Sequence, residues 1–201
     1  MSDVSRWNER YAKGDTPWET GQPSSELQHV IAEVPIRPCR ALELGCGTGP
    51  SAVWLAQQGF DVTALDLSPL AIERARQRAD AARASVHCLV ADVLKPPAEL
   101  AGVFDFFFDR GCYHVVRREN VAAYLETLRR LTHSGTLGLV LAGNAREPHE
   151  PGPPVVSEEE IRNEMGSLFD IVQLREFRFE QVEGVGTRFL GWSCLLRRRS
   201  G

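Results

Sequence analysis

Three acidic residues each end an apolar run in the first half of the chain, and a glycine turn follows the first of them. Glu43 precedes the turn Gly45–Gly49, with the sequence GCGTG, and Asp66 and Asp92 end the next two runs. Asp66 follows the first glycine by about 20 residues, a spacing at which a carboxylate accepts hydrogen bonds from ribose hydroxyls. Glycines let a ligand approach the backbone closely. The pattern predicts a site for a nucleoside or a dinucleotide.

Two details distinguish these ligands. The dinucleotide fingerprint G-x-G-x-x-G needs a third glycine, where this chain has Pro50. In addition, a carboxylate at Glu43 would repel a diphosphate but attract an ammonium group. The three acids therefore favour a cationic nucleoside. The alternative is a tight turn flanked by solvated acids, with no ligand.

The segments around these residues alternate between strand and helix patterns. Strands are predicted over residues 40–44, 61–66, 85–90, 102–109 and 135–143, and helices over 48–58, 69–84, 120–131 and 158–169. Two helical pieces at 3–12 and 24–34 precede them, and strands at 171–180 and 188–196 follow, joined by the hairpin sequence EGVGT. The expected α/β fold is a seven-stranded, mostly parallel, doubly wound (Rossmann-like) sheet with a C-terminal antiparallel hairpin and an N-terminal helical lid.

Length and composition indicate one domain over residues 1–201. Its expected parts are lid helices (1–35), a cofactor-binding core (36–145), and a substrate-side loop, helix and closing hairpin (146–201). The loop at 144–156 is rich in proline, so no regular structure is expected there. Hydrophobic residues make up 43% and the net charge is −4, which argues against binding nucleic acid by bulk charge.

Other global features point to a cytoplasmic protein. The five cysteines contain no CxxC pair, the five histidines show no metal-ligand spacing, and no apolar run is long enough to span a membrane. We therefore expect reduced thiols, no metal and no membrane partner, in a monomer or weak homodimer.

Three motifs together resemble class I S-adenosylmethionine-dependent methyltransferases: ELGCGTG, TALDLS and VADV. Two further stretches, RWNERYAKGDTPWETGQP and FDFFFDRGCYHVV, look like the thiopurine S-methyltransferase-like branch, which includes bacterial thiol, tellurite and heterocycle methyltransferases. The resemblance implies S-adenosylmethionine as cofactor, S-adenosylhomocysteine as product and a small-molecule methyl acceptor.

The resemblance also implies a role for each matching residue of the core. The glycine turn contacts the methionine part of the cofactor, and the acids contact its polar groups. The implied cofactor residues are Glu43, Gly45, Cys46, Gly47, Asp66, Leu67, Asp92, Val93 and Asp109.

Three aromatic residues near the N-terminus are expected on the cofactor side. Trp7 and Tyr11 are four residues apart, so they share one helix face, and Trp18 follows in an irregular stretch. Aromatic faces attract cations such as a sulfonium, and Trp18 is also expected to touch the substrate. The alternative is that these residues pin the N-terminal helix to the sheet.

The residues after the fourth strand carry the catalytic expectations. Arg110 would favour an anionic acceptor, and its alternative role is a salt bridge to Asp109 or Asp105. His114 could deprotonate an acceptor, and Tyr113 could line the substrate pocket.

These residues lead to one main hypothesis for the reaction. The predicted activity is methyl transfer by in-line displacement to a thiol or selenol, or to an acidic heterocyclic hydroxyl. Alternatives are a protein-lysine or nucleic-acid methyltransferase, or a non-catalytic S-adenosylmethionine-binding module.

Overall fold

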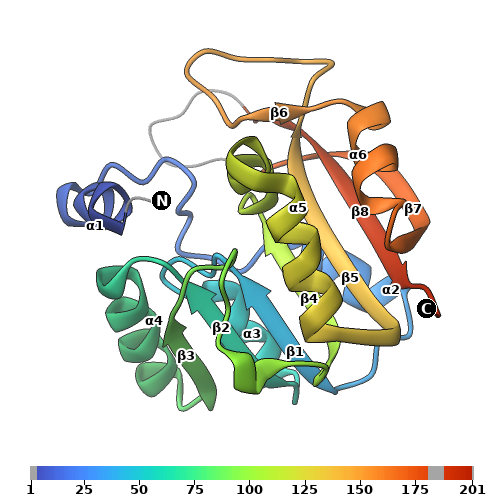
Figure 1. Ribbon diagram of the computed structural model, residues 1–201. Coiled ribbons are helices and arrows are strands. Elements are labelled where there is room, and N and C mark those ends of the chain that lie inside the picture. Colours follow the sequence, from blue (N-terminus) through green and yellow to red (C-terminus); the bar gives the residue numbers. More distant parts are fainter. Residues whose placement is uncertain (1–3, 181–187, 201) are drawn as a thin grey trace.

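The computed structural model describes residues 4–180 and 188–200, and within them eight strands form one twisted sheet (Figure 1). The order is β3-β2-β1-β4-β5-β8-β7, and β6 pairs with β5. The strands are β1 (Arg40–Leu44), β2 (Asp61–Asp66), β3 (Val86–Val90), β4 (Phe104–Arg110), β5 (Thr132–Asn144), β6 (Val155–Val156), β7 (Phe169–Arg178) and β8 (Leu190–Arg198).

Helices cover both faces of this sheet, and each face has its own apolar cluster. One cluster joins the sheet to α2, α3 and α4 through residues such as Leu27, Leu55 and Ile72. The other joins it to α5 and α6 through Tyr124 and Met165. The helices are α1 (Val4–Lys13), α2 (Ser25–Glu33), α3 (Pro50–Gln57), α4 (Pro69–Ala82), α5 (Tyr113–Leu131) and α6 (Glu158–Met165), with a 3-10 turn at Ala98–Leu100.

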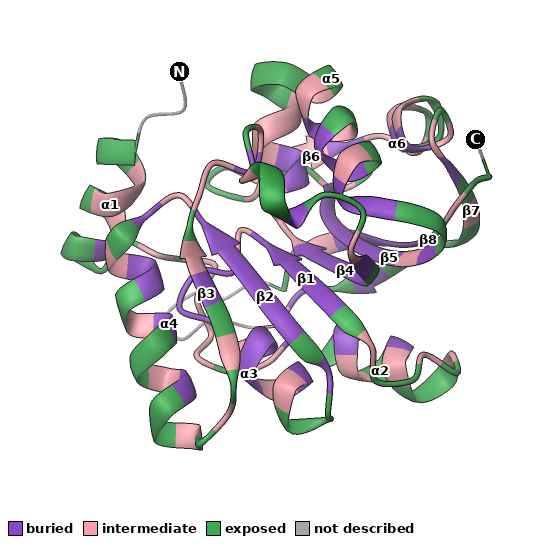
Figure 2. Cartoon of the chain, turned by 60° about the horizontal axis from the view of Figure 1, so that its bottom comes forward, coloured by how far each residue is buried: buried purple, intermediate pink, exposed green. Residues whose placement is uncertain are grey.

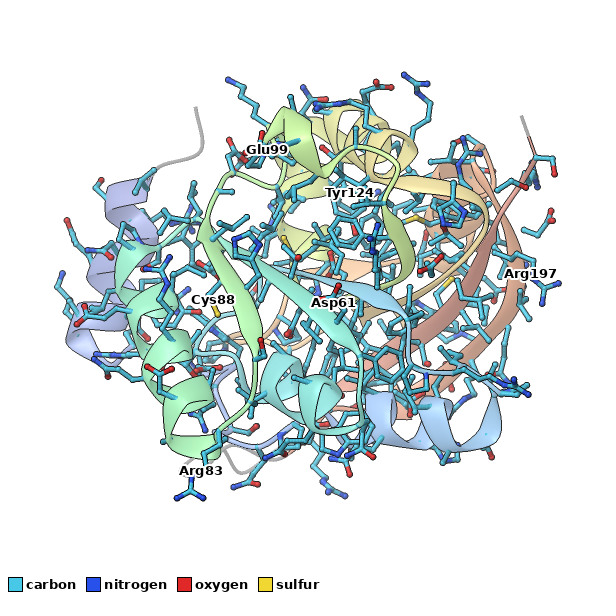
Figure 3. All side chains as sticks on the ribbon, turned by 90° about the horizontal axis from the view of Figure 1, so that it is seen from below. Asp61, Arg83, Cys88, Glu99, Tyr124 and Arg197 are labelled. Carbon is cyan, nitrogen blue, oxygen red and sulfur yellow. The ribbon has the colours of Figure 1, made fainter. Side chains whose placement is uncertain are left out.

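Burial follows this layered arrangement. The central strands are almost wholly buried, whereas the helices expose their outer faces (Figure 2). Seen from below, Tyr124 lies in the interior, and Arg197, near the C-terminal end of β8, points outward (Figure 3). A strand buried on both faces must be nearly continuous in apolar residues, which explains why Glu43 within β1 is conspicuous.

Strand pairing aligns the ends of the parallel strands that carry the predicted site. In β1, Leu44 pairs with Leu65 of β2 and with Asp109 of β4. β8 pairs antiparallel with both β5 and β7, so the mostly parallel, doubly wound sheet with an antiparallel C-terminal pair of strands is confirmed. The predicted turn EGVGT between these strands lies outside the described residues.

The largest differences from expectation concern α5, the proline-rich loop and α6. α5 begins at Tyr113 rather than at residue 120, because the helix before the kink at Asn120 starts on the Asp109 carboxylate. The proline-rich loop contains a two-residue strand, β6, paired with the end of β5. α6 ends at Met165, and Phe169 instead opens β7.

Hydrogen bonds of side chains attach the N-terminal segment to the core. On α1, Asn8 Oδ1 accepts hydrogen bonds from Ser68 Oγ (2.9 Å) and Leu70 N (3.0 Å) at the start of α4. From α4, Arg78 donates to the carbonyls of Gly21 (3.1 Å) and Thr48 (3.0 Å). The lid segment and the glycine turn are therefore held by one arginine. In the described part of the chain, every helix is too short or too polar to cross a membrane.

Candidate cofactor and acceptor site

The glycine turn after β1 adopts a left-handed backbone that only glycine takes without strain. Gly45 has φ +66° and Gly47 has φ +55°. A Cβ at Gly45 would lie 2.8 Å from Cys112 Cβ, and one at Gly47 would lie 2.9 Å from the Tyr11 hydroxyl. Both glycines are thus required by close contact as well as by conformation.

Asp66 holds this turn from the end of β2. Its Oδ2 accepts the Gly47 amide at 2.9 Å, and its Oδ1 accepts the Ser68 amide at 2.8 Å. Burial raises the pKa of the carboxyl to about 6, although both hydrogen bonds lower it. Asp66 therefore shapes the turn as well as presenting an acid at the strand end.

Glu43 is the least compensated acid of the site. Its side chain is 5% exposed, and Oε2 has no hydrogen-bond partner among the described residues. Burial, with the nearby charge of Glu19, raises the pKa of Glu43 to about 8. A buried carboxyl oxygen without a partner is costly, so the donor set fits a ligand with an ammonium group.

The third acidic strand end lies beside the second. Ala91 N donates to Asp66 O at 2.9 Å, which brings the end of β3 against that of β2. Asp92 Oδ1 caps the Leu94 amide at 2.9 Å and is half-buried, as is Leu67, while Val93 is buried. The structure therefore brings four of the predicted cofactor residues, Asp66, Leu67, Asp92 and Val93, to one edge of the sheet.

The lid aromatics form a cluster at the mouth of the pocket. The Trp18 ring meets those of Trp7 and Tyr11 edge-on, with centroids 5.6 and 6.0 Å away. Trp18 Nε1 donates to the Tyr11 hydroxyl at 3.3 Å, and Arg10 stacks over Trp18 at 4.2 Å. These contacts agree with the alternative in which the aromatic residues fix α1, and Trp18 also lines the pocket.

The pocket beneath this cluster is narrow, with a volume of about 30 Å³. It is lined from the lid side by the segment around Trp18 and from the core by Glu43, the glycine turn and Arg110. Typical small-molecule sites measure about 300–1,000 Å³, so this pocket accounts for only a small part of a site for a nucleoside.

Glu19 is a pocket residue that sequence patterns did not identify. Its Oε2 accepts a hydrogen bond from the Thr48 hydroxyl, and Oε1 faces Gly47. Glu19 lies within the stretch RWNERYAKGDTPWETGQP, directly after Trp18, but no role of its own was predicted for it from the sequence.

Arg110 joins three distant segments at the acceptor side. Its guanidinium donates to the Trp18 carbonyl at 3.0 Å and to Glu180 at 2.8 Å, and it packs over the Phe179 ring at 5.5 Å. The alternative ion pair with Asp109 or Asp105 is therefore wrong, since the partner comes from the segment after β7. Long-range pairing of this kind has no signature in local sequence.

Asp109, Tyr113 and His114 face the interior instead. Asp109 is fully buried and accepts hydrogen bonds from the Cys112 and Tyr113 amides and from Tyr124 Oη at 2.7 Å. Burial raises its pKa to about 7. The Asp109 carboxyl therefore anchors the start of α5. These hydrogen bonds occupy the oxygens with which Asp109 was expected to contact the cofactor.

Tyr113 and His114, at the start of α5, also use their polar atoms in hydrogen bonds within the protein. Tyr113 is buried in the core, and its hydroxyl donates to Glu164 at 2.6 Å, so it does not form the expected pocket wall. His114 Nδ1 accepts the Gly143 amide at 3.0 Å, and burial lowers the imidazole pKa to about 3. A neutral ring with Nδ1 occupied carries its proton on Nε2, which leaves no free lone pair for a general base.

Proteins with known structures share this architecture. One of them was solved in work on the conversion of a disulfide bond into a thioacetal group during echinomycin biosynthesis. This chain superimposes on it with a TM-score of 0.85 and 25% identity, over 98% of this chain and 93% of that one. The 1,6-didemethyltoxoflavin-N1-methyltransferase of Burkholderia thailandensis, solved with S-adenosylhomocysteine, gives a TM-score of 0.76 at 20% identity over 98% of this chain and 87% of that one. The fold is therefore that of S-adenosylmethionine-dependent methyltransferases.

Sequence comparison narrows this class to one family. The model of the thiopurine S-methyltransferase (TPMT) family matches residues 2–192, and the chain belongs to that family.

Two curated relatives illustrate its range. A 2-heptyl-1-hydroxyquinolin-4(1H)-one methyltransferase of Mycobacteroides abscessus is 30% identical over 73% of this chain and 65% of its own length. A probable thiol methyltransferase 2 of Arabidopsis thaliana is 35% identical over 36% of this chain and 32% of its own. The chain thus spans less than two thirds of the length of either relative.

Proposed function

We propose that this protein transfers a methyl group from S-adenosylmethionine to a small nucleophile and releases S-adenosylhomocysteine. The observation that carries the proposal is the buried, unpartnered oxygen of Glu43 beside a left-handed glycine turn, in a member of an S-methyltransferase family. A cation suits this acid, and a diphosphate does not. The bound sulfonium supplies a methyl group activated towards nucleophilic attack.

The chain's own residues then bind and orient this cofactor. The acids receive its polar groups, and the aromatic cluster of the lid excludes water and favours positive charge. The residues assigned to the cofactor are Trp7, Tyr11, Trp18, Glu43, Gly45, Cys46, Gly47, Asp66, Leu67, Asp92 and Val93. Asp109 contributes indirectly, by holding the start of α5.

We assign Arg110 to the acceptor. Its guanidinium is shared with Glu180 and the Trp18 carbonyl, so an anionic acceptor would compete with Glu180 for it. An arginine favours the ionised form of a thiol, a selenol or an acidic heterocyclic hydroxyl. In-line transfer to such an anion requires positioning and desolvation but no general base, which agrees with the occupied Nδ1 of His114.

Radiolabelled methyl transfer tests this function. The full chain is incubated with tritiated S-adenosylmethionine and a panel of thiols, selenite, tellurite, halides and hydroxylated heterocycles. We expect turnover with one acceptor class and none with protein or RNA fractions. Labelling of protein or RNA alone would favour the lysine or nucleic-acid alternatives, and cofactor binding without any turnover would favour a binding module.

The proposal extends to the surroundings in which the enzyme works. All five cysteines, each within the described residues, are free, which suits the reducing cytoplasm. We propose a cytoplasmic monomer or weak homodimer that acts without nucleic acid.

A further inference from the structure

Glu19 brings a carboxylate from the lid onto the glycine turn. Its Oε2 accepts a hydrogen bond from the Thr48 hydroxyl. Its Oε1 lies 3.3 Å from the position that a Cβ on Gly47 would take, and the Tyr11 hydroxyl lies 2.9 Å from the same point. The carboxylate therefore lies against the glycine turn.

Two other acids surround the same turn. Glu43 lines the pocket with Glu19 and has an unpartnered oxygen, and Asp66 bonds to the Gly47 amide from behind. The charge of Glu19 raises the pKa values of both, although burial is the larger cause in each case. Glu19 and Glu43 thus line one small pocket, and Asp66 lies close enough for its charge to interact with that of Glu19.

The nearby cations compensate this cluster only in part: the charge of Arg110 lowers the pKa of Glu43, but burial and the charge of Glu19 outweigh it. Arg78 uses its guanidinium on the carbonyls of Thr48 and Gly21, and Arg110 is bound to Glu180. Over residues 4–180 and 188–200, no ion pair involves Glu19, Glu43 or Asp66. Neighbouring carboxyl groups without a direct ion-pair partner repel one another when they ionise, so the arrangement favours a ligand that brings a positive charge.

We infer that Glu19 is a cofactor-binding residue that forms, with Glu43, a cation site for the ammonium group of the cofactor's amino-acid portion. The inference rests on the proposed function and deepens it. Because Glu19 belongs to the lid and Glu43 to the sheet, a cation held between them draws the lid onto the core. The charge of the ligand, rather than its adenosine, then drives closure.

Calorimetry with two ligands tests this role. S-adenosylhomocysteine carries the ammonium group, whereas 5′-methylthioadenosine keeps the adenosine and sulfur but lacks the amino-acid portion. Glu19→Gln keeps the shape of the side chain and removes its charge. Asp15→Asn is the matched control, because Asp15 is an exposed lid carboxylate paired with Arg10 at 3.1 Å.

The inference predicts a selective loss. Glu19→Gln should weaken S-adenosylhomocysteine binding by about tenfold or more, as expected for losing a charged partner. The same variant should bind methylthioadenosine as the unmodified chain does, and Asp15→Asn should change neither affinity. Thermal unfolding of each variant verifies that the fold is kept.

Trypsin gives a second readout of closure, since Lys13 is exposed at the end of α1 and precedes Gly14. S-adenosylhomocysteine should protect this bond in the unmodified chain but much less in Glu19→Gln, and methylthioadenosine should protect it in neither.

Each other outcome contradicts the inference in a recognisable way. Unchanged or tighter S-adenosylhomocysteine binding by Glu19→Gln would show that Glu19 merely occupies the pocket. Equal losses for both ligands would show that it only shapes the lid. If the unmodified chain binds neither ligand, the proposed function fails together with the inference.

Discussion

The two ends of the sheet differ in both volume and charge. The amino end has a hollow of about 600 Å³ lined by Cys39, Asp61, Asp105 and His133 among others, whereas the pocket at the carboxyl end measures about 30 Å³. Yet at the amino end Asp105 is exposed and bonded to His133 at 3.0 Å, while at the carboxyl end Glu43 is buried and one of its carboxyl oxygens has no hydrogen-bond partner among the described residues. A buried acid without a full set of partners is therefore a better guide to the functional site than the volume of a hollow.

The comparison is sharpest along β2, which has an aspartate at each end. Asp66→Ala should abolish cofactor binding, a loss of more than about 100-fold, because it removes the acceptor of two backbone amides and of the ribose hydroxyls. Asp61→Ala, at the exposed amino end, should change the affinity by less than about twofold. Calorimetry with S-adenosylhomocysteine measures both, and equal losses would remove the distinction between the two ends.

Arginines allow a similar contrast in turnover. Arg110→Ala should lower turnover by about 10- to 100-fold, because the acceptor anion loses a charged hydrogen bond, while cofactor affinity should stay within about threefold. Arg40→Ala, exposed at the amino end, should leave turnover unchanged. Initial rates and calorimetry on both variants separate these effects. Equal loss of cofactor affinity and turnover in Arg110→Ala would assign Arg110 to the cofactor instead.

Proton linkage should also distinguish the carboxyl end. Glu43 has a raised pKa of about 8 in the free protein, and Glu19, Asp66 and Arg110 face it. A cationic ligand favours the ionised carboxyl, so binding below this pKa must release a proton. S-adenosylhomocysteine affinity should therefore rise between about pH 6 and 8, by up to about tenfold per pH unit.

Buffers of different ionisation enthalpy reveal this proton in calorimetry. In Glu43→Gln, the proton release and the pH dependence should both largely disappear. A pH dependence that persists unchanged in the variant would assign the titration to another group.

The smallest effect is expected at the start of α5. His114→Asn offers an amide oxygen in place of Nδ1 for the Gly143 amide, so turnover should fall by less than about threefold, with a cost of about 1–2 kcal/mol in unfolding free energy from lost packing. Rates and thermal unfolding check this. A loss near 100-fold in turnover with unchanged stability would restore His114 as a catalytic base.

Much of the core could be predicted from sequence because its signals are local. The ends of β1 and β2 matched the expected residues, since an apolar run followed by glycine or by an acid marks a buried parallel strand. The starts of the helices predicted from residues 69 and 158 were also correct, because the caps that fix them, Ser68 and Ser157, bond to amides only three residues on.

The lid and the acceptor side could not be derived in the same way. Glu19 reaches Thr48, and Arg110 reaches Glu180, through tertiary contacts that no short spacing encodes. α5 was predicted only from Asn120 onward, where the apolar residues recur at helical spacing. The structure has a kink at this residue, whose side chain caps the Ala123 amide. The first part of that helix depends on the buried Asp109, which accepts the Tyr113 amide at the helix start and the Tyr124 hydroxyl from the part of α5 after the kink.

Titration of the full chain with S-adenosylmethionine and, separately, with NAD tests most directly whether the carboxyl end of the sheet is a cation-selective nucleoside site. We predict one bound S-adenosylmethionine per chain and no detectable binding of NAD. Binding of NAD without any response to S-adenosylmethionine would contradict this view of the site.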